Sequence, residues 1–156
     1  YSSTNNMYSL WLAKDHVKND VILIEGDVVF EKKMLMPLID SNKPNVVLVA
    51  KYNETIPGTV ITMDKETNTI KSFIGSKDQE ETKSYFMDKY KTINIYLFKK
   101  HFFEEHLMPS LENHMSNYGK QDYYEVALGT LVSSKIGIYA HLIENVRWYE
   151  VDNNID

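Results

Sequence analysis

Two acidic motifs carry the side chains best suited to chemistry, and the first of them is Glu25-Gly26-Asp27. It follows Val21–Ile24, an apolar and mostly β-branched run that predicts a strand buried on both faces. Gly26 allows the backbone to turn tightly or to approach a ligand closely. Asp27 would then project beyond the carboxyl end of the strand, where α/β sheets bind ligands and where a carboxylate suits Mg²⁺. The alternative is an aspartate in an ordinary turn.

The second acidic motif is Trp148-Tyr149-Glu150-Val151-Asp152 near the end of the sequence. In an extended segment the side chains alternate, so Trp148, Glu150 and Asp152 would share one face. Two carboxylates and an indole are costly to bury without partners, which favours a binding role for this face. The alternative is a solvated edge strand.

Other catalytic motifs are absent from the sequence. The five histidines have no metal-ligand spacing, and there is no serine nucleophile elbow and no glycine-rich phosphate loop. The chain has no cysteine, which excludes disulfides, thiolate metal sites and cysteine nucleophiles. Because such a sequence suits a reducing compartment, we expect a cytoplasmic protein.

The hydrophobic pattern predicts alternating helices and strands in one domain, residues 1–156. We expect an α/β domain with a mixed, mainly parallel sheet, because a strand, a helix and a strand follow one another within about 30 residues. Asp122 and Glu125 have the spacing of a capping box at the start of a helix. The expected helices are 7–18, 32–41, 100–117 and 122–132, and the expected strands are 21–24, 46–50, 59–63, 70–74, 91–98, 138–143 and 148–152.

Length and charge limit the classes of partner. A chain of 156 residues is long enough to bury a core. Its net charge of −5 argues against a nucleic-acid partner, since such domains usually carry a basic face. No apolar run approaches the roughly 18 residues that cross a bilayer, so we expect no membrane partner.

Four segments of the sequence are informative together. They are Ser-Thr-Asn-Asn-Met-Tyr-Ser-Leu at residues 3–10, Leu-Ile-Glu-Gly-Asp-Val-Val-Phe at 23–30, Lys-Thr-Ile-Asn-Ile-Tyr at 91–96 and Trp-Tyr-Glu-Val-Asp at 148–152. In this order they resemble the cytidylyltransferases that activate phosphocholine or 2-aminoethylphosphonate with CTP. That family is similar to the sugar-phosphate nucleotidyltransferases, so the resemblance implies a Rossmann-like, glycosyltransferase-A-like fold.

The resemblance also implies a reaction and its residues. CMP would pass from CTP to a small phosphonate or phosphate ester, with Mg²⁺ as the cofactor and pyrophosphate as the second product. Asp27 and Asp152 match the metal-binding aspartates of the family, and we expect their carboxylates within about 4–7 Å of each other. Lys51, Lys91 and Asn94 fall where contacts to the acceptor's phosphate or phosphonate are expected, and Lys91 is expected to be catalytic with the two aspartates.

An amine-recognising pocket is the third implication. Tyr123, Trp148 and Glu150 fall near it by resemblance. Tyr123 and Tyr124 are also aromatic residues that, with Trp148, could attract a cationic amine.

The resemblance has one departure. The glycine-rich loop ending in arginine with which the family begins, and the Pro-Lys motif after it, have no counterpart here. We therefore expect a partial catalytic domain that lacks its first βαβ portion, and an exposed sheet edge that favours a homodimer.

Two alternatives remain. One is a sugar-1-phosphate nucleotidyltransferase of the same fold, for which an aromatic and acidic acceptor pocket is unsuited. The other is a non-catalytic α/β binding domain, which the presence of both Asp27 and Asp152 disfavours.

Overall fold

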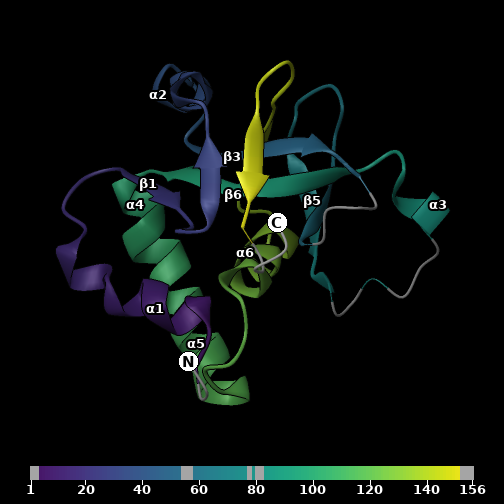
Figure 1. Cartoon of the computed structure of the whole chain (residues 1–156). Helices are drawn as coiled ribbons and strands as arrows, with labels where there is room; N and C mark the ends of the chain where they lie inside the picture. The colour runs from purple at the N-terminus through teal and green to yellow at the C-terminus, as the bar shows by residue number, and fades with distance from the viewer. Residues whose placement is uncertain (1–3, 54–57, 77–78, 80–82, 152–156) are drawn as a thin grey trace.

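The computed structural model describes residues 4–53, 58–76, 79 and 83–151. Its centre is a six-stranded sheet in the order β5-β4-β6-β3-β7, with β1 also paired to β6 (Figure 1). A separate two-stranded sheet joins β2 to β8. The strands are β1 (Val21–Ile24), β2 (Val28–Phe30), β3 (Asn45–Lys51), β4 (Val60–Met63), β5 (Ile70–Ile74), β6 (Tyr90–Phe98), β7 (Tyr139–Leu142) and β8 (Trp148–Glu150).

The longest helical region consists of three segments that follow one another without a break. Lys100 to Tyr118 is helical throughout, but five residues of it, Phe103–Leu107, form a π-helical stretch. Pro109 lies two residues after this stretch and lacks a backbone N–H, so the wider turns accommodate the helix where a regular hydrogen bond is missing. The α-helices are α1 (Asn6–Leu12), α2 (Met36–Ile39), α3 (Lys83–Phe86), α4 (Lys100–Phe102), α5 (Met108–Tyr118) and α6 (Tyr124–Ser133), and short 3-10 helices cover Lys14–His16 and Lys32–Leu35.

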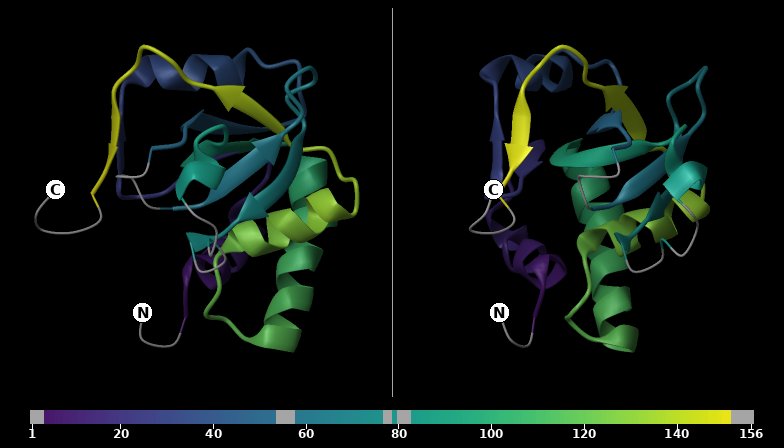
Figure 2. Two further views of the ribbon diagram at one scale, coloured as in Figure 1. Left: turned by 90° about the vertical axis from the view of Figure 1, so that its right-hand side faces the viewer. Right: turned by 45° about the vertical axis from the view of Figure 1, so that its right-hand side comes forward.

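Alternation along the central strands builds a core on each face of the sheet. Val47 and Val49 of β3 pack with α1, α4, α5 and α6 on one face. Val46 and Leu48 pack with α2 and β2 on the other. The two views of Figure 2 show the same layers. Because side chains of a strand alternate between faces, an unbroken apolar run is what such a doubly covered strand requires.

The fold confirms the α/β class and the mixed sheet, but the expectation of a mainly parallel sheet was wrong. Of the described strand pairs, β3 with β7 is parallel and the others are antiparallel. The strands β1 and β3 do run in the same direction, yet the antiparallel β6 lies between them. An apolar run indicates that both faces of a strand are covered. It does not indicate whether the neighbouring strands are parallel or antiparallel to it.

Most other elements lie where the sequence predicts them. The hairpin of β4 and β5 is confirmed, and so are β6 and the long helix after it. The expected helix 7–18 ends earlier, at Leu12. The prediction of a capping box at Asp122 is wrong, because the N-cap of α6 is Tyr123, whose side chain makes no capping hydrogen bond to the helix. The Asp122 carboxylate instead contacts His114 Nε2 at 2.8 Å. No helix among the described residues is long and apolar enough to span a bilayer.

Neighbouring residues of α2 test the two-layer packing. Leu38 is fully buried in the core on the α2 face, whereas Ile39 is 62% exposed. We expect Leu38→Ala to lower the free energy of unfolding by about 2–5 kcal/mol, because it leaves a cavity. The matched change Ile39→Ala should cost about 0.5 kcal/mol or less. Urea denaturation measures both, and equal losses would show that α2 does not pack as described.

Candidate functional site

The site lies where two strands part along one edge of β6. The last residues of β6 pair with β1, and its first residues pair with β4. Because β3 occupies the other edge, β1 and β4 share this one. Thr92 N–H donates to the Thr59 carbonyl and Glu25 N–H donates to the Asn94 carbonyl, so the strands separate around Ile93. Asn94 has a left-handed backbone there, with φ at 58°.

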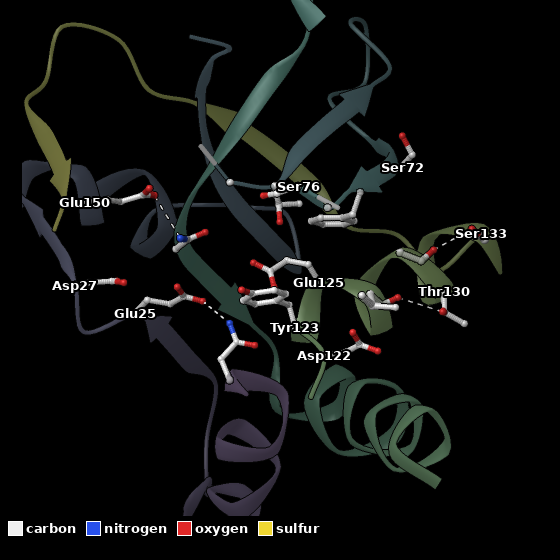
Figure 3. A pocket seen from close by; sticks show the side chains of 18 residues that line it. Glu25, Asp27, Ser72, Ser76, Asp122, Tyr123, Glu125, Thr130, Ser133 and Glu150 are labelled. Carbon is white, nitrogen blue, oxygen red and sulfur yellow. Dashed lines mark hydrogen bonds between the residues drawn. The ribbon is translucent and has the colours of Figure 1, made fainter. Parts of the chain in front are cut away.

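A cavity of about 950 Å³ opens at this separation (Figure 3). Residues of α1, β5, β6, α6 and β8 line it, together with the segments that follow β1 and precede β4, and many of the lining side chains are acidic. No lysine, arginine or histidine is found among the described lining residues. The lining carboxylates are Glu25, Asp27, Asp122, Glu125 and Glu150. Such a cavity favours cations over anions at its acidic end.

A buried ion pair joins β6 to β8 at the edge of the cavity. Lys91 Nζ donates to both carboxylate oxygens of Glu150, at 2.7 and 2.8 Å, and to the Thr92 carbonyl at 3.2 Å. The two side chains are only 2% and 6% exposed. Gly58 makes room for the ammonium, since a Cβ there would lie 2.9 Å from Nζ and its φ of +125° suits glycine. The pair therefore neutralises Glu150.

Glu25 belongs to a hydrogen-bonded group at the floor of the site. Its Oε1 accepts from the Tyr124 hydroxyl at 2.6 Å and from the Asn6 side-chain amide at 3.0 Å. Burial raises the pKa of Glu25, and the charges of Asp27 and Glu150 raise it further, against the lowering effect of its donors. Like charges near a carboxyl group favour its neutral form.

Glu125 lies deeper and is less well satisfied. Its residue is 5% exposed, and its Oε1 accepts from the Tyr96 hydroxyl at 3.1 Å. Its Oε2 is buried without a hydrogen-bond partner. Burial, followed by the charge of Glu25, raises the pKa of Glu125 to about 7. A buried carboxylate with an unpaired oxygen costs stability, so the protein keeps an unfavourable group at this site.

Asp27 is one of the residues that line the cavity. Its carbonyl accepts from Val151 N–H at 2.9 Å, which brings the end of β8 beside it. Asp152 lies outside the described residues, so the shared metal site of Asp27 and Asp152 stays a prediction. Within the described ranges no three His, Cys, Asp or Glu side chains are grouped as ligands for one ion.

The other expected residues divide between the cavity and its surroundings. Asn94 and Tyr123 line the cavity, and the Asn94 amide donates to Glu150 at 3.3 Å. Lys51 is exposed at the end of β3 and is not among the lining residues. Trp148 packs against the core on the α2 face, with its ring centroid 5.3 Å from Lys91 Nζ, and does not line the cavity either. Their roles toward an acceptor stay predictions.

Sequence reasoning missed Glu125 as a site residue. The only signals for Glu125 in the sequence are its position after two tyrosines and its spacing from Asp122, and that spacing predicts a helix cap. Its contact with Tyr96 joins α6 to β6, and only the fold brings these elements together.

Comparisons with known proteins bear on the whole chain. No protein-family model matches it. The curated CMP-5'-(3-aminopropyl)phosphonate synthase from Streptomyces rubellomurinus is 31% identical over 157 residues, covering 97% of this chain and 24% of that protein. The chain is therefore similar in sequence to part of this CMP-linked aminoalkylphosphonate synthase. The resemblance found in the sequence is thereby confirmed, although the chain spans only about a quarter of that curated relative.

Solved structures of two CTP-dependent transferases have the same fold as this chain. The CTP:phosphocholine cytidylyltransferase from Streptococcus pneumoniae matches with a TM-score of 0.75 at 15% identity, over 99% of this chain and 61% of that one. The inositol-1-phosphate CTP transferase from T. maritima matches with a TM-score of 0.71 at 17% identity, over 98% and 58%. The chain has the nucleotidyltransferase fold.

The ion pair at the cavity edge gives a stability test. We expect Glu150→Gln to lower the free energy of unfolding by about 3–5 kcal/mol, because it leaves the Lys91 ammonium buried without its counter-charge. The double variant Lys91→Met/Glu150→Gln should recover much of this loss. In the exposed pair Lys100–Glu104, both side chains are more than 40% exposed, and Glu104→Gln should cost about 0.5 kcal/mol or less. Chemical denaturation of the four proteins measures the difference, and similar costs at both pairs would contradict the buried geometry.

Proposed function

We propose that this protein transfers CMP from CTP to a small phosphonate or phosphate ester that carries an amine. An acceptor oxygen attacks the α-phosphorus of CTP, the new oxygen–phosphorus bond forms, and the bond to the β-phosphate breaks to release pyrophosphate. The observation that carries the proposal is an acidic cavity beside Asp27, in a nucleotidyltransferase fold and in a relative of an aminoalkylphosphonate enzyme.

The acceptor's two ends would meet different parts of the site. Its anionic end needs donors, and the Asn94 amide lies at the cavity, with the Lys91 ammonium at its edge. An anion there would compete with Glu150 for Lys91, whose three N–H groups are all engaged. Its cationic end would be stabilised by the carboxylates of the cavity.

The residues present suit a divalent cation. Mg²⁺ is commonly held by one or two carboxylates and by the substrate's phosphates, and Asp27 offers an exposed carboxylate in the cavity beside Glu25. We propose that Asp27, with Asp152, holds Mg²⁺. When bound, this ion would offset the repulsion between two anionic reactants.

A panel of acceptors tests the reaction. The full-length protein is given CTP and Mg²⁺ with 3-aminopropylphosphonate, 2-aminoethylphosphonate, phosphocholine or glucose 1-phosphate, and pyrophosphate release and the product mass are measured. We expect CMP-linked products with the amine-bearing acceptors. Turnover of glucose 1-phosphate instead would favour a sugar nucleotidyltransferase, and no turnover at all would favour a binding domain.

A substitution of Asp27 tests its proposed role in holding the metal. We expect Asp27→Asn to lower kcat/KM by about 100-fold or more, the scale seen when one stabilising group at the reacting charge is lost. Asp40→Asn replaces an exposed aspartate at the end of α2, outside the cavity, and should leave kcat/KM unchanged. Full activity of Asp27→Asn at limiting Mg²⁺ would remove Asp27 from the proposed metal site.

A further inference from the structure

The carboxylates of the cavity differ in the hydrogen-bond and ionic partners that their oxygens already have. Glu150 is paired with Lys91, Asp122 contacts His114, and Glu25 accepts from Tyr124 and Asn6. Asp27 is exposed to solvent. Among the residues that the structure describes, Glu125 is the carboxylate with a buried oxygen that has no hydrogen-bond partner.

Glu125 also has a central place in the cavity. It lines the cavity from the first turn of α6, and in the view of Figure 3 it lies between Glu25 and Asp27 on one side and Thr130 and Ser133 on the other. Its other oxygen is fixed by the Tyr96 hydroxyl. The side chain is therefore held in place, while Oε2 awaits a donor.

We propose that Glu125 Oε2 accepts a hydrogen bond from the acceptor's ammonium group, and that the site thereby selects amines with an N–H over quaternary ammonium groups. The inference rests on the proposed function and narrows its substrate class to aminoalkyl phosphonates or phosphates. A quaternary ammonium brings charge but no hydrogen-bond donor, so it would leave the buried Oε2 unpaired, which is the costly state.

The aromatic residues of the cavity do not outweigh this preference. Quaternary ammonium groups are recognised by several rings arranged around the cation. Among the described residues, Phe73 and Tyr123 line the cavity, Tyr123 is 47% exposed, and Trp148 packs elsewhere. A half-exposed ring attracts a cation less than a buried carboxylate that receives a charge-assisted hydrogen bond.

The experiment compares 3-aminopropylphosphonate with its N-methyl, N,N-dimethyl and N,N,N-trimethyl analogues in the full-length protein. CTP and Mg²⁺ are saturating and the pH is about 8, above the pKa of about 7 for Glu125. We expect kcat/KM to change little while one N–H remains. It should fall by about 10- to 100-fold at the trimethyl analogue, the value of one charge-assisted hydrogen bond.

Two variants separate recognition from structure. Glu125→Gln should lower kcat/KM for the primary amine by a similar factor and change it by less than about threefold for the trimethyl analogue, so that selectivity collapses. Asp40→Asn changes an exposed aspartate outside the cavity, and the selectivity ratio should persist. If Glu125→Gln does not fold, the comparison of the four acceptors in the unchanged protein still tests the inference.

The outcomes are distinguishable from those of the proposed function. Pyrophosphate release at equal efficiency from the primary and trimethyl acceptors would overturn the inference and leave the cytidylyl transfer standing. Equal losses for both acceptors in Glu125→Gln would likewise show that Glu125 supports the fold and does not select the amine. Failure to use any amine-bearing acceptor would overturn both proposals.

Discussion

The shared edge of β6 is the constraint on which the site depends. One nine-residue strand pairs with β3 along one edge and must serve both β4 and β1 along the other. Because β1 pairs with residues 95–98 of β6 and β4 pairs with residues 90 and 91, the left-handed Asn94 lies in the stretch between them. The cavity is the consequence, since Gly58 and Thr59 beside β4 and Glu25 beside β1 become its opposite walls.

Charge then decides what this cavity can hold. Five carboxylates among the described residues line it. The pKa of Glu25 and that of Glu125 are both raised, because burial and like charges disfavour ionisation. Lys91 removes one of these charges through Glu150. Of the others, Asp27 is exposed and Glu125 has a buried oxygen without a partner. A divalent metal at Asp27 and an ammonium at Glu125 would offset their charges.

The sequence predicts local features well and long-range ones less well. The hairpin of β4 and β5, the strand β6 and the place of Asp27 after β1 follow from periodicity and turn chemistry within a few residues. The direction of β1 depends on a partner strand about 70 residues later, which its own apolar run does not encode. Glu125 was missed for the same reason, because its contact with Tyr96 arises only when α6 packs on the sheet.

The most direct test of the account is a crystal structure of the full-length protein with Mn²⁺ and CMP-aminopropylphosphonate. Mn²⁺ replaces Mg²⁺ in oxygen sites and can be located by its anomalous scattering. The account predicts the metal on the Asp27 carboxylate, the ligand between Glu25 and Gly58, and its ammonium within hydrogen-bond distance of Glu125 Oε2. A ligand bound outside this cavity, or an ammonium directed away from Glu125 into solvent, would contradict it.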